Sequence, residues 1–341
     1  MGRVVLVTGV SRDFGGRFAR RMAAESSIDR VIGVDVVPPR HDLGDVGFIR
    51  ADIRTPVIAK VIAGQDVDTV VHLSVQSSPN EPGQPGGRTS MKEHNVIGTM
   101  QLLAACQKAP GLERLVVKSS GAVYGSSSRD PAMFTEDMSA KRMPRSGYGK
   151  DVLEVEGYVR GFARRRPDVA VTMLRAANVV GPSVVSPLTQ YFRLPVVPTV
   201  LGYDARLQFL HEGDLLDVLR HATLGGVHGT FNVAGDGVLV LSQALRRIGR
   251  PTLPVPTFAI GPLAALSRQA GVKGLPPELA GYLTFGRGLD TARMRSVLGF
   301  SPAFTTAQAF ADFGRTVAPS PVPRPLGATA STASTAGGTH G

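Results

Sequence analysis

A glycine-rich turn at residues 8–16, with the sequence TGVSRDFGG, could bind a pyrophosphate. It follows an apolar run and opens a stretch of helical periodicity, so backbone N–H groups and a helix N-terminus would face one point without interference from side chains. Asp35, twenty residues past Gly15, would end the next strand, where its carboxylate can accept hydrogen bonds from both ribose hydroxyls. A plain strand-to-helix turn capped by an aspartate would use the same residue types, but the combination favours a dinucleotide cofactor.

The charge of Asp35 distinguishes between two such cofactors. A carboxylate at this position would repel the 2′-phosphate of NADP, because both groups are negative. We therefore expect NAD rather than NADP.

The elements that must position this turn alternate along the first half of the chain. Apolar β-branched runs alternate with segments of helical periodicity, which is typical of βαβ units and a parallel sheet. The expected strands are residues 3–8, 30–35, 48–51, 69–73, 115–119 and 170–174. The expected helices in this half are residues 14–26, 56–63, 89–107 and 146–165. The sequence predicts an α/β protein with a Rossmann-type doubly wound parallel sheet.

The domain organisation follows from where this alternation stops. Residues 1–181 are expected to form the NAD-binding Rossmann domain, with later segments near 205–250 returning to it. Over residues 182–317 the pattern loosens and prolines become frequent, which indicates a smaller, interleaved C-terminal substrate-binding domain with a last helix near 306–316. The tail, residues 318–341, is rich in Ala, Ser, Thr, Pro and Gly and is expected to be disordered.

Eight further short segments fall in the order in which they occur in one known family. They are 51–54 (ADIR), 70–74 (VVHLS), 95–99 (NVIGT), 119–125 (SSGAVYG), 174–182 (LRAANVVGP), 209–214 (FLHEGD), 231–235 (FNVAG) and 298–302 (LGFSP). Through them, residues 3 to about 316 resemble the extended short-chain dehydrogenases/reductases, the NAD-dependent epimerases and dehydratases such as UDP-glucose 4-epimerase. Each segment alone is weak evidence, whereas eight in sequence support one another.

The resemblance implies NAD as the cofactor and a nucleotide sugar as the substrate. The residues that it assigns to NAD are Gly9, Arg12, Phe14, Gly15, Asp35, Asp52, Ile53, Leu73, Ser74, Asn95 and Lys150. Those that it assigns to the substrate are Tyr124, Asn178 and Arg206, with Arg193 as another candidate for the phosphates. It also implies a homodimer, in which the helices at 89–107 and 146–165 pair across a two-fold axis.

Ser120, Tyr148 and Lys150 are the candidate catalytic residues. By the same resemblance, the hydroxyl of Ser120 could hold a substrate oxygen, and Lys150 could reach the nicotinamide ribose and favour ionisation of a neighbouring phenol. A strand-ending serine bonded to backbone and a solvated lysine are the plainer alternatives. His72 and His211 are expected to pack or to bond loops rather than to act as bases.

Two positions depart from the family pattern. Arg12 replaces the middle glycine of Gly-x-x-Gly-x-x-Gly, where its side chain could clasp phosphate charge or weaken binding. Ser146 stands where the family has its acid/base tyrosine, four residues before Lys150 on the same helical face. Tyr148 lies two residues before Lys150, about 200° around an α-helix, so the acid/base group is missing or displaced.

These departures leave three hypotheses. The first is an NAD-dependent epimerase or dehydratase with a non-standard active site, in which NAD accepts and returns a hydride. The second is a catalytically degenerate NAD-binding scaffold or sensor. The third, RNA binding by a basic member of the fold, has less support: the net charge is +11, but no aromatic residues interleave with the run Arg164–Arg166, so no nucleic-acid partner is expected.

The remaining composition fits a cytoplasmic protein, and no metal site is expected. The single cysteine, Cys106, excludes an intramolecular disulfide and agrees with a reducing compartment. No apolar run approaches the roughly 20 residues that a membrane span needs, and the apolar stretch at the N-terminus is too short for a signal peptide.

Overall fold

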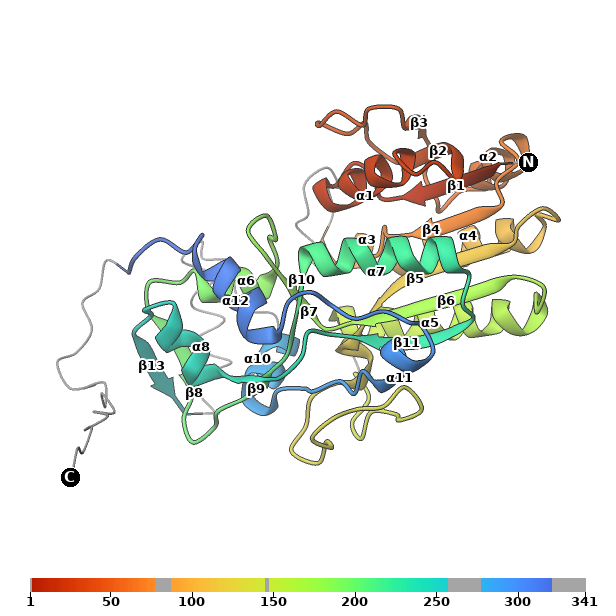
Figure 1. Ribbon diagram of the computed structural model, residues 1–341. Helices are drawn as coiled ribbons and strands as arrows, with labels where there is room; N and C mark the ends of the chain where they lie inside the picture. Colours follow the sequence, from red (N-terminus) through yellow and green to blue (C-terminus); the bar gives the residue numbers. More distant parts are fainter. Residues whose placement is uncertain (1, 78–86, 145–146, 257–276, 321–341) are drawn as a thin grey trace, which may run out of the picture.

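The structure is a computed structural model that describes residues 2–77, 87–144, 147–256 and 277–320. At its centre lies a seven-stranded sheet with the order β11-β6-β5-β4-β1-β2-β3, in which every neighbouring pair is parallel (Figure 1). Its strands are β1 (Arg3–Thr8), β2 (Ile28–Asp35), β3 (Gly47–Arg50), β4 (Thr69–His72), β5 (Arg114–Ser120), β6 (Ala170–Ala176) and β11 (Gly229–Val233). The order reverses between β1 and β4, and doubly wound sheets bind their ligands at the carboxyl ends of such strands.

Helices cover both faces of this sheet. On the face towards the viewer in Figure 1 they are α1 (Asp13–Ala23) and α7 (Glu212–Gly225). On the other face they are α2 (Val57–Gly64), α4 (Gly98–Gln107) and α5 (Gly147–Arg165). Side chains of a strand alternate between the faces, so Val5 and Val7 of β1 enter one apolar layer and Leu6 enters the other.

The helical run before α4 contains an irregular turn. α3 (Arg88–Lys92) continues into a π-helical turn, η1 (Glu93–Ile97), which continues into α4. The sequence predicted this run as one helix over 89–107. A π turn holds more residues than an α turn, and the side chains of three consecutive residues, His94, Asn95 and Val96, are buried here.

All six strands predicted from the sequence are present, and their ends differ from the prediction by two residues at most. The seventh strand, β11, was not among them, because GTFNV is short and begins with glycine; pairing with β6 forms it. The helix predicted over 14–26 ends at Ala23, since the chain turns there to enter β2. Most of the tail predicted at 318–341 lies outside the described residues.

A second group of elements lies beyond the carboxyl edge of the sheet (Figure 1). Its paired strands are β7 (Asn178–Val180) with β10 (Phe209–His211), β8 (Val197–Val200) with β13 (Thr252–Val255), and β9 (Arg206–Leu207) with β12 (Leu239–Val240). Its helices are α6 (Pro187–Phe192), α8 (Leu241–Arg247), α10 (Pro277–Phe285) and α12 (Thr306–Gly314). They enclose an apolar cluster of their own, in which the rings of Phe192 and Phe310 are 5.0 Å apart.

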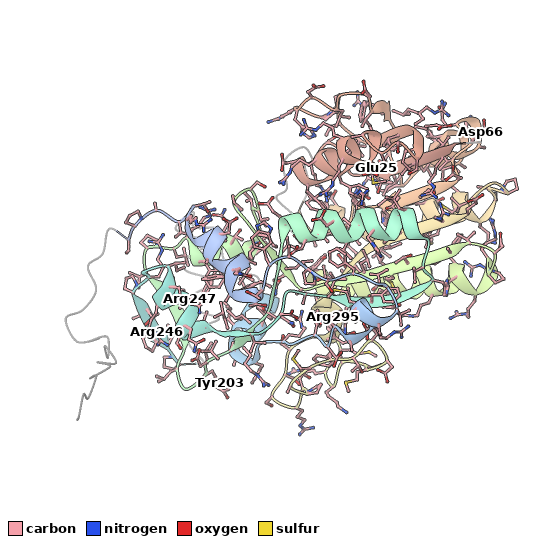
Figure 2. All side chains as sticks on the ribbon, viewed as in Figure 1. Glu25, Asp66, Tyr203, Arg246, Arg247 and Arg295 are labelled. Carbon is pink, nitrogen blue, oxygen red and sulfur yellow. The ribbon has the colours of Figure 1, made fainter. Side chains whose placement is uncertain are left out.

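The basic side chains are spread over the molecule, and many are used within the fold. Figure 2 shows Arg246 and Arg247 on α8, far from Arg295, which pairs with Asp236. Arg166, from the basic run noted in the sequence, donates to the carbonyl of Cys106 at the end of α4 at 3.1 Å. This distribution favours solvated or paired charge over a nucleic-acid surface.

A buried ion pair joins β6 to α5. Arg175 of β6 donates from Nε and Nη2 to Oε1 and Oε2 of Glu156 on α5, at 2.9 and 2.8 Å. Glu156 is fully buried and Arg175 is 8% exposed. Burial opposes the charge on Arg175, but the bonds to Glu156 outweigh it and raise the pKa of the guanidinium. Its Nη1 donates to the hydroxyl of Tyr124 at 2.6 Å, so the pair also holds the segment after β5.

Arg175→Leu should lower the free energy of unfolding by about 3–5 kcal/mol, because Glu156 would stay buried without its main partner. Arg160→Ala is the matched control, since Arg160 is half-exposed and donates to the same carboxylate at 2.9 Å. Its loss should cost less than about 1 kcal/mol. Urea denaturation followed by circular dichroism measures both, and equal losses would contradict the central role of the buried pair.

Candidate functional site

The turn between β1 and α1 brings backbone elements into unusually close contact. Gly9 has a φ of 84°, and a Cβ on it would lie 3.0 Å from the Cα of Ser74. A Cβ on Gly15 would overlap the carbonyl oxygen of Gly9. The two glycines therefore let the N-terminus of α1 approach the ends of β1 and β4, as pyrophosphate binding requires. Phe14 is partly buried and packs against the core.

Asp35 lies at this turn, as the sequence predicted. Its Oδ2 accepts a hydrogen bond from the amide of Ser11 at 3.0 Å, and its Oδ1 accepts one from the amide of Val36 at 2.8 Å. The carboxylate thus caps the turn, as in the plainer alternative, and is 8% exposed. Each carboxylate oxygen can accept a second hydrogen bond, so the cap leaves room for the ribose contact.

Asp52 and Ile53 follow β3 on the far side of the turn. The Nε of Arg54 lies 3.0 Å from both carboxylate oxygens of Asp52, and its Nη2 donates to Oδ2 at 2.7 Å. Burial opposes ionisation of Asp52, but the bonds from Arg54 prevail and lower its pKa. Ile53 is buried, 2.9 Å from where a Cβ on Gly98 would lie. The adenine contact assigned to this segment stays a prediction.

The end of β4 is buried beside the turn. Leu73 and Ser74 are 6% and 4% exposed. The Nδ1 and Nε2 atoms of His72 each lie 2.9 Å from a threonine hydroxyl, those of Thr8 and Thr99. Burial lowers the pKa of His72 to about 3, so the ring is neutral and lies between Thr8 of β1 and Thr99 of α4.

Asn95, in the π turn, connects the end of β4 to α5. Its Oδ1 accepts from the amide of Gln76 at 2.7 Å, and its Nδ2 donates to the carbonyl of Gln76 at 3.0 Å. The same Nδ2 donates to Oδ2 of Asp151 on α5 at 3.2 Å. Asn95 therefore positions the wall of the cofactor site through contacts within the protein.

Ser120 ends β5 and begins η2 (Gly121–Tyr124), a 3₁₀ turn. Its Oγ accepts from the amide of Ala122 at 3.2 Å, which is the backbone contact of the plainer alternative, and its hydroxyl proton can still be donated. Tyr124 is 1% exposed, and its hydroxyl lies 2.9 Å from Oδ1 of Asn232 and accepts from Arg175. The substrate contact predicted for Tyr124 does not fit this position, because the hydroxyl is enclosed by protein.

Tyr148 and Lys150 lie in the first turn of α5 and point in different directions. Tyr148 is partly buried and packs against the apolar core. The side chain of Lys150 is 43% exposed, and its Nζ lies 3.8 Å from Oε1 of Glu154. Gly149 lets this turn approach η2, since its Cβ would lie 3.1 Å from the carbonyl of Ala122. Ser146 lies outside the described residues.

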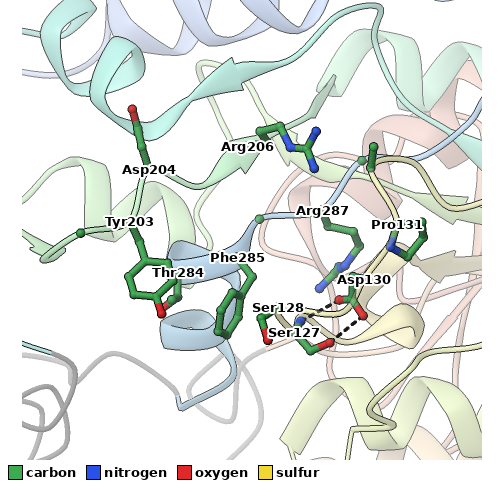
Figure 3. A pocket seen from close by; sticks show the side chains of 14 residues that line it. Ser127, Ser128, Asp130, Pro131, Tyr203, Asp204, Arg206, Thr284, Phe285 and Arg287 are labelled. Atoms are coloured by element: carbon green, nitrogen blue, oxygen red, sulfur yellow. Dashed lines mark hydrogen bonds between the residues drawn. The ribbon is translucent and has the colours of Figure 1, made fainter.

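A cavity of about 340 Å³ lies between the segment after η2, β9 and the end of α10 (Figure 3). Its polar and charged side chains are Ser127, Ser128, Asp130, Tyr203, Asp204, Arg206, Thr284 and Arg287. Arg287 donates from Nε to the carbonyl of Gly125 at 2.8 Å and from Nη2 to Oγ of Ser126 at 3.2 Å. Burial lowers its pKa. The cavity thus joins Arg206, which the sequence predicted, to Arg287, which no motif marks.

The other predicted residues lie apart from this cavity. Arg193 donates to the carbonyl of Thr316 at 2.9 Å and stacks on Phe313, so the phosphate contact proposed for it does not fit. Asn178 begins β7, opposite Phe209 of β10. His211 caps α7, because its Nδ1 accepts from the amide of Gly213 at 3.1 Å.

The sheet order, the glycine turn and the aspartate at the end of β2 together define a doubly wound protein that binds an NAD-type dinucleotide. The chain matches the model of the NAD dependent epimerase/dehydratase family over residues 5–234, and it belongs to this family. Its cofactor is NAD, and the turn, Asp35 and the end of β4 fit that cofactor. Among the described residues, no helix is both long and apolar enough to cross a membrane.

Relatives by sequence include an uncharacterized protein of Mycobacterium tuberculosis, which is 50% identical over 318 residues, 92% of this chain and 84% of that protein. The UDP-glucose 4-epimerase 2 of Oryza sativa subsp. japonica is 34% identical over 138 residues, 40% of this chain and 32% of that protein.

Two solved structures show the same fold. The dTDP-glucose 4,6-dehydratase of Bacillus anthracis, in complex with NAD, has a TM-score of 0.68 at 18% identity and covers 92% of this chain and 96% of its own. The UDP-glucose 4-epimerase of Thermotoga maritima, with UDP-glucose, has a TM-score of 0.67 at 19% identity and covers 92% and 98%.

NAD should bind at least about 100-fold more tightly than NADP, because Asp35 would meet the 2′-phosphate with like charge. Asp35→Asn should reduce the ratio of NAD affinity to NADP affinity about tenfold. Asp29→Asn is the control, since Asp29 is exposed near the other end of β2. Calorimetric titration with both cofactors measures the ratio, and equal affinities in the native protein would overturn the role given to Asp35.

Proposed function

We propose that the chain catalyses the epimerisation or the dehydration of a nucleotide sugar. The observation that carries this proposal is that one segment, η2, borders both binding regions. Its N-cap, Ser120, lies at the carboxyl edge of the sheet, and the chain that follows η2 enters the wall of the polar cavity at Ser127 and Ser128. The segment that lines the cavity at Gly288 continues against η2, because the side chain of the next residue, Leu289, lies 3.2 Å from where a Cβ on Gly121 would be.

The residues of the site divide into binding and reacting groups. Arg206 and Arg287 are suited to the diphosphate of the substrate, because guanidinium groups hold phosphate oxygens in a bidentate way. Asn178 is assigned to the nucleotide. Ser120 would orient a sugar hydroxyl by donating its free proton. Bound NAD supplies a reversible hydride acceptor.

Tyr148 is proposed as the displaced acid/base group. It lies in the first turn of α5, where the positive end of the helix dipole favours a phenolate. Its ring is partly buried and packs against the core.

A second candidate function is that of an NAD-binding scaffold or sensor without turnover. The observation that favours it is the position of Lys150, which lies beside Glu154 and is 43% exposed. A lysine held there does not reach into the site, and the tyrosine that normally accompanies it is replaced by Ser146.

Tyr148→Phe should lower turnover by about 10²–10⁴ while leaving NAD affinity unchanged, since only the acid/base group is lost. Tyr158→Phe, on an exposed tyrosine of the same helix, is the control. Conversion of UDP-glucose and of UDP-glucuronic acid is followed by chromatography, and NAD binding by calorimetry.

An active protein that is indifferent to Tyr148→Phe would contradict this role. If the native protein turns over neither probe, Ser146→Tyr is the informative variant, since it restores the four-residue spacing to Lys150. Activity gained by that variant would support the scaffold function for the native chain.

We also propose a homodimer built on α4 and α5. Ile97, Met100 and Tyr158 are 41%, 38% and 41% exposed, and they come from helical segments that pack against each other. Met100→Glu should convert dimer to monomer, because it would bury two charges at the contact. Val57→Glu, at an exposed apolar residue of α2, should leave the dimer intact. Light scattering at micromolar concentration measures the molar mass of the native protein and of both variants. A monomeric native protein would refute the proposal.

A further inference from the structure

The guanidinium of Arg12 lies between the ends of β1 and β4, the two strands at which the order of the sheet reverses. Arg12 is the residue before α1, and it makes no side-chain cap for that helix. Its Nη2 donates to the carbonyl of Ser74 at 3.1 Å, and its Nη1 reaches the carbonyl of Val75 at 3.5 Å. One side chain therefore connects the glycine turn after β1 to the chain that leaves β4.

This position coincides with the part of the site that NAD must occupy. The amides of the first turn of α1 face the same point, and Gly9 touches Ser74 beside it. A diphosphate bound at the turn must therefore meet the Arg12 guanidinium, either as a ligand or as an obstacle.

Two buried histidines, His72 and His94, lie beside Ser74 and therefore near the Arg12 guanidinium. His94 is 2% exposed, and burial, followed by the charges of Arg12 and Arg54, lowers its pKa to about 4. Burial, His94 and Arg12 act on His72 in the same direction. Arg12 thus places a positive charge at the end of β4, where it would attract an anion.

The bond between Arg12 and Ser74 can be given up at little cost. The Nε2 of His94 lies 3.2 Å from the same carbonyl, so this oxygen keeps a hydrogen-bond partner when Arg12 leaves. The carbonyls of Ser74 and Val75, which Arg12 now contacts, are neutral. A bond to a phosphate oxygen would be charge-assisted at both ends and roughly twice as strong.

We propose that Arg12 is a ligand of the NAD diphosphate, which the free protein holds against the carbonyls of Ser74 and Val75. Binding transfers the guanidinium from the end of β4 to the diphosphate. The side chain thus replaces the close backbone approach that a glycine gives elsewhere in the family. This inference rests on NAD binding and not on the reaction proposed above.

The test compares NAD, ADP-ribose and adenosine by calorimetry, because the first two carry the diphosphate and the third does not. Arg12→Gly should weaken binding of NAD and of ADP-ribose about tenfold at low salt. The difference from the native protein should shrink as salt rises, since salt screens the lost attraction. Adenosine should bind as before. The affinity of Arg12→Lys for NAD should lie between those of the native protein and Arg12→Gly. Lysine keeps the positive charge but lacks the paired N–H donors of a guanidinium.

Two features make these outcomes decisive. Glycine is tolerated at the start of a helix, so Arg12→Gly should fold, and Arg20→Ala removes an exposed arginine of α1 as a control for net charge. Unchanged or tighter NAD binding in Arg12→Gly would show that Arg12 is an obstacle and overturn the proposal. An equal loss for adenosine would also overturn it, since Arg12 would then only support the fold.

Discussion

The contact on which the rest of the site depends is the buried pair of Arg175 and Glu156. A charge in the interior is tolerated only where its partner is fixed, so this pair constrains every element that contributes to it. The carboxylate also accepts from Ser119 at 2.6 Å, and the arginine also donates to the carbonyl of Glu136. Strands β5 and β6, helix α5 and the segment after η2 therefore share one polar network.

This network determines where the reacting groups stand. Ser119 is bonded to Glu156, so the end of β5 that carries Ser120 is held by the same carboxylate. Tyr124, at the end of η2, accepts a hydrogen bond from Arg175 and so joins η2 to the network. Glu156 also anchors α5, whose first turn carries Tyr148. A site of this kind is built on strands and helix ends, and its precision comes from buried polar contacts behind it.

The parts of the molecule that the sequence predicted are those specified by local chemistry. The six strands follow from apolar runs that fill both faces of a sheet, and the turn follows from glycines that nothing larger can replace. The order of the short segments then identified the family. The enclosure of Tyr124 could not be predicted from its own segment, because the partner that bonds its hydroxyl, Arg175, comes from a different strand. Arg287 was missed for a similar reason, since only tertiary contact brings it to the cavity.

The π turn within the helical run from α3 to α4 can be regarded as one residue more than an α-helix would hold. An α-helix advances about 100° for each residue, so such an insertion offsets the faces of the helix on either side of it. The segments before and after η1 can therefore pack their apolar faces against different neighbours. Asn95, within the π turn, lies in the interior against the chain leaving β4. Ile97, the last residue of the turn, and Met100 of α4 are exposed instead, so one helical run provides both a buried polar contact and an apolar outer surface.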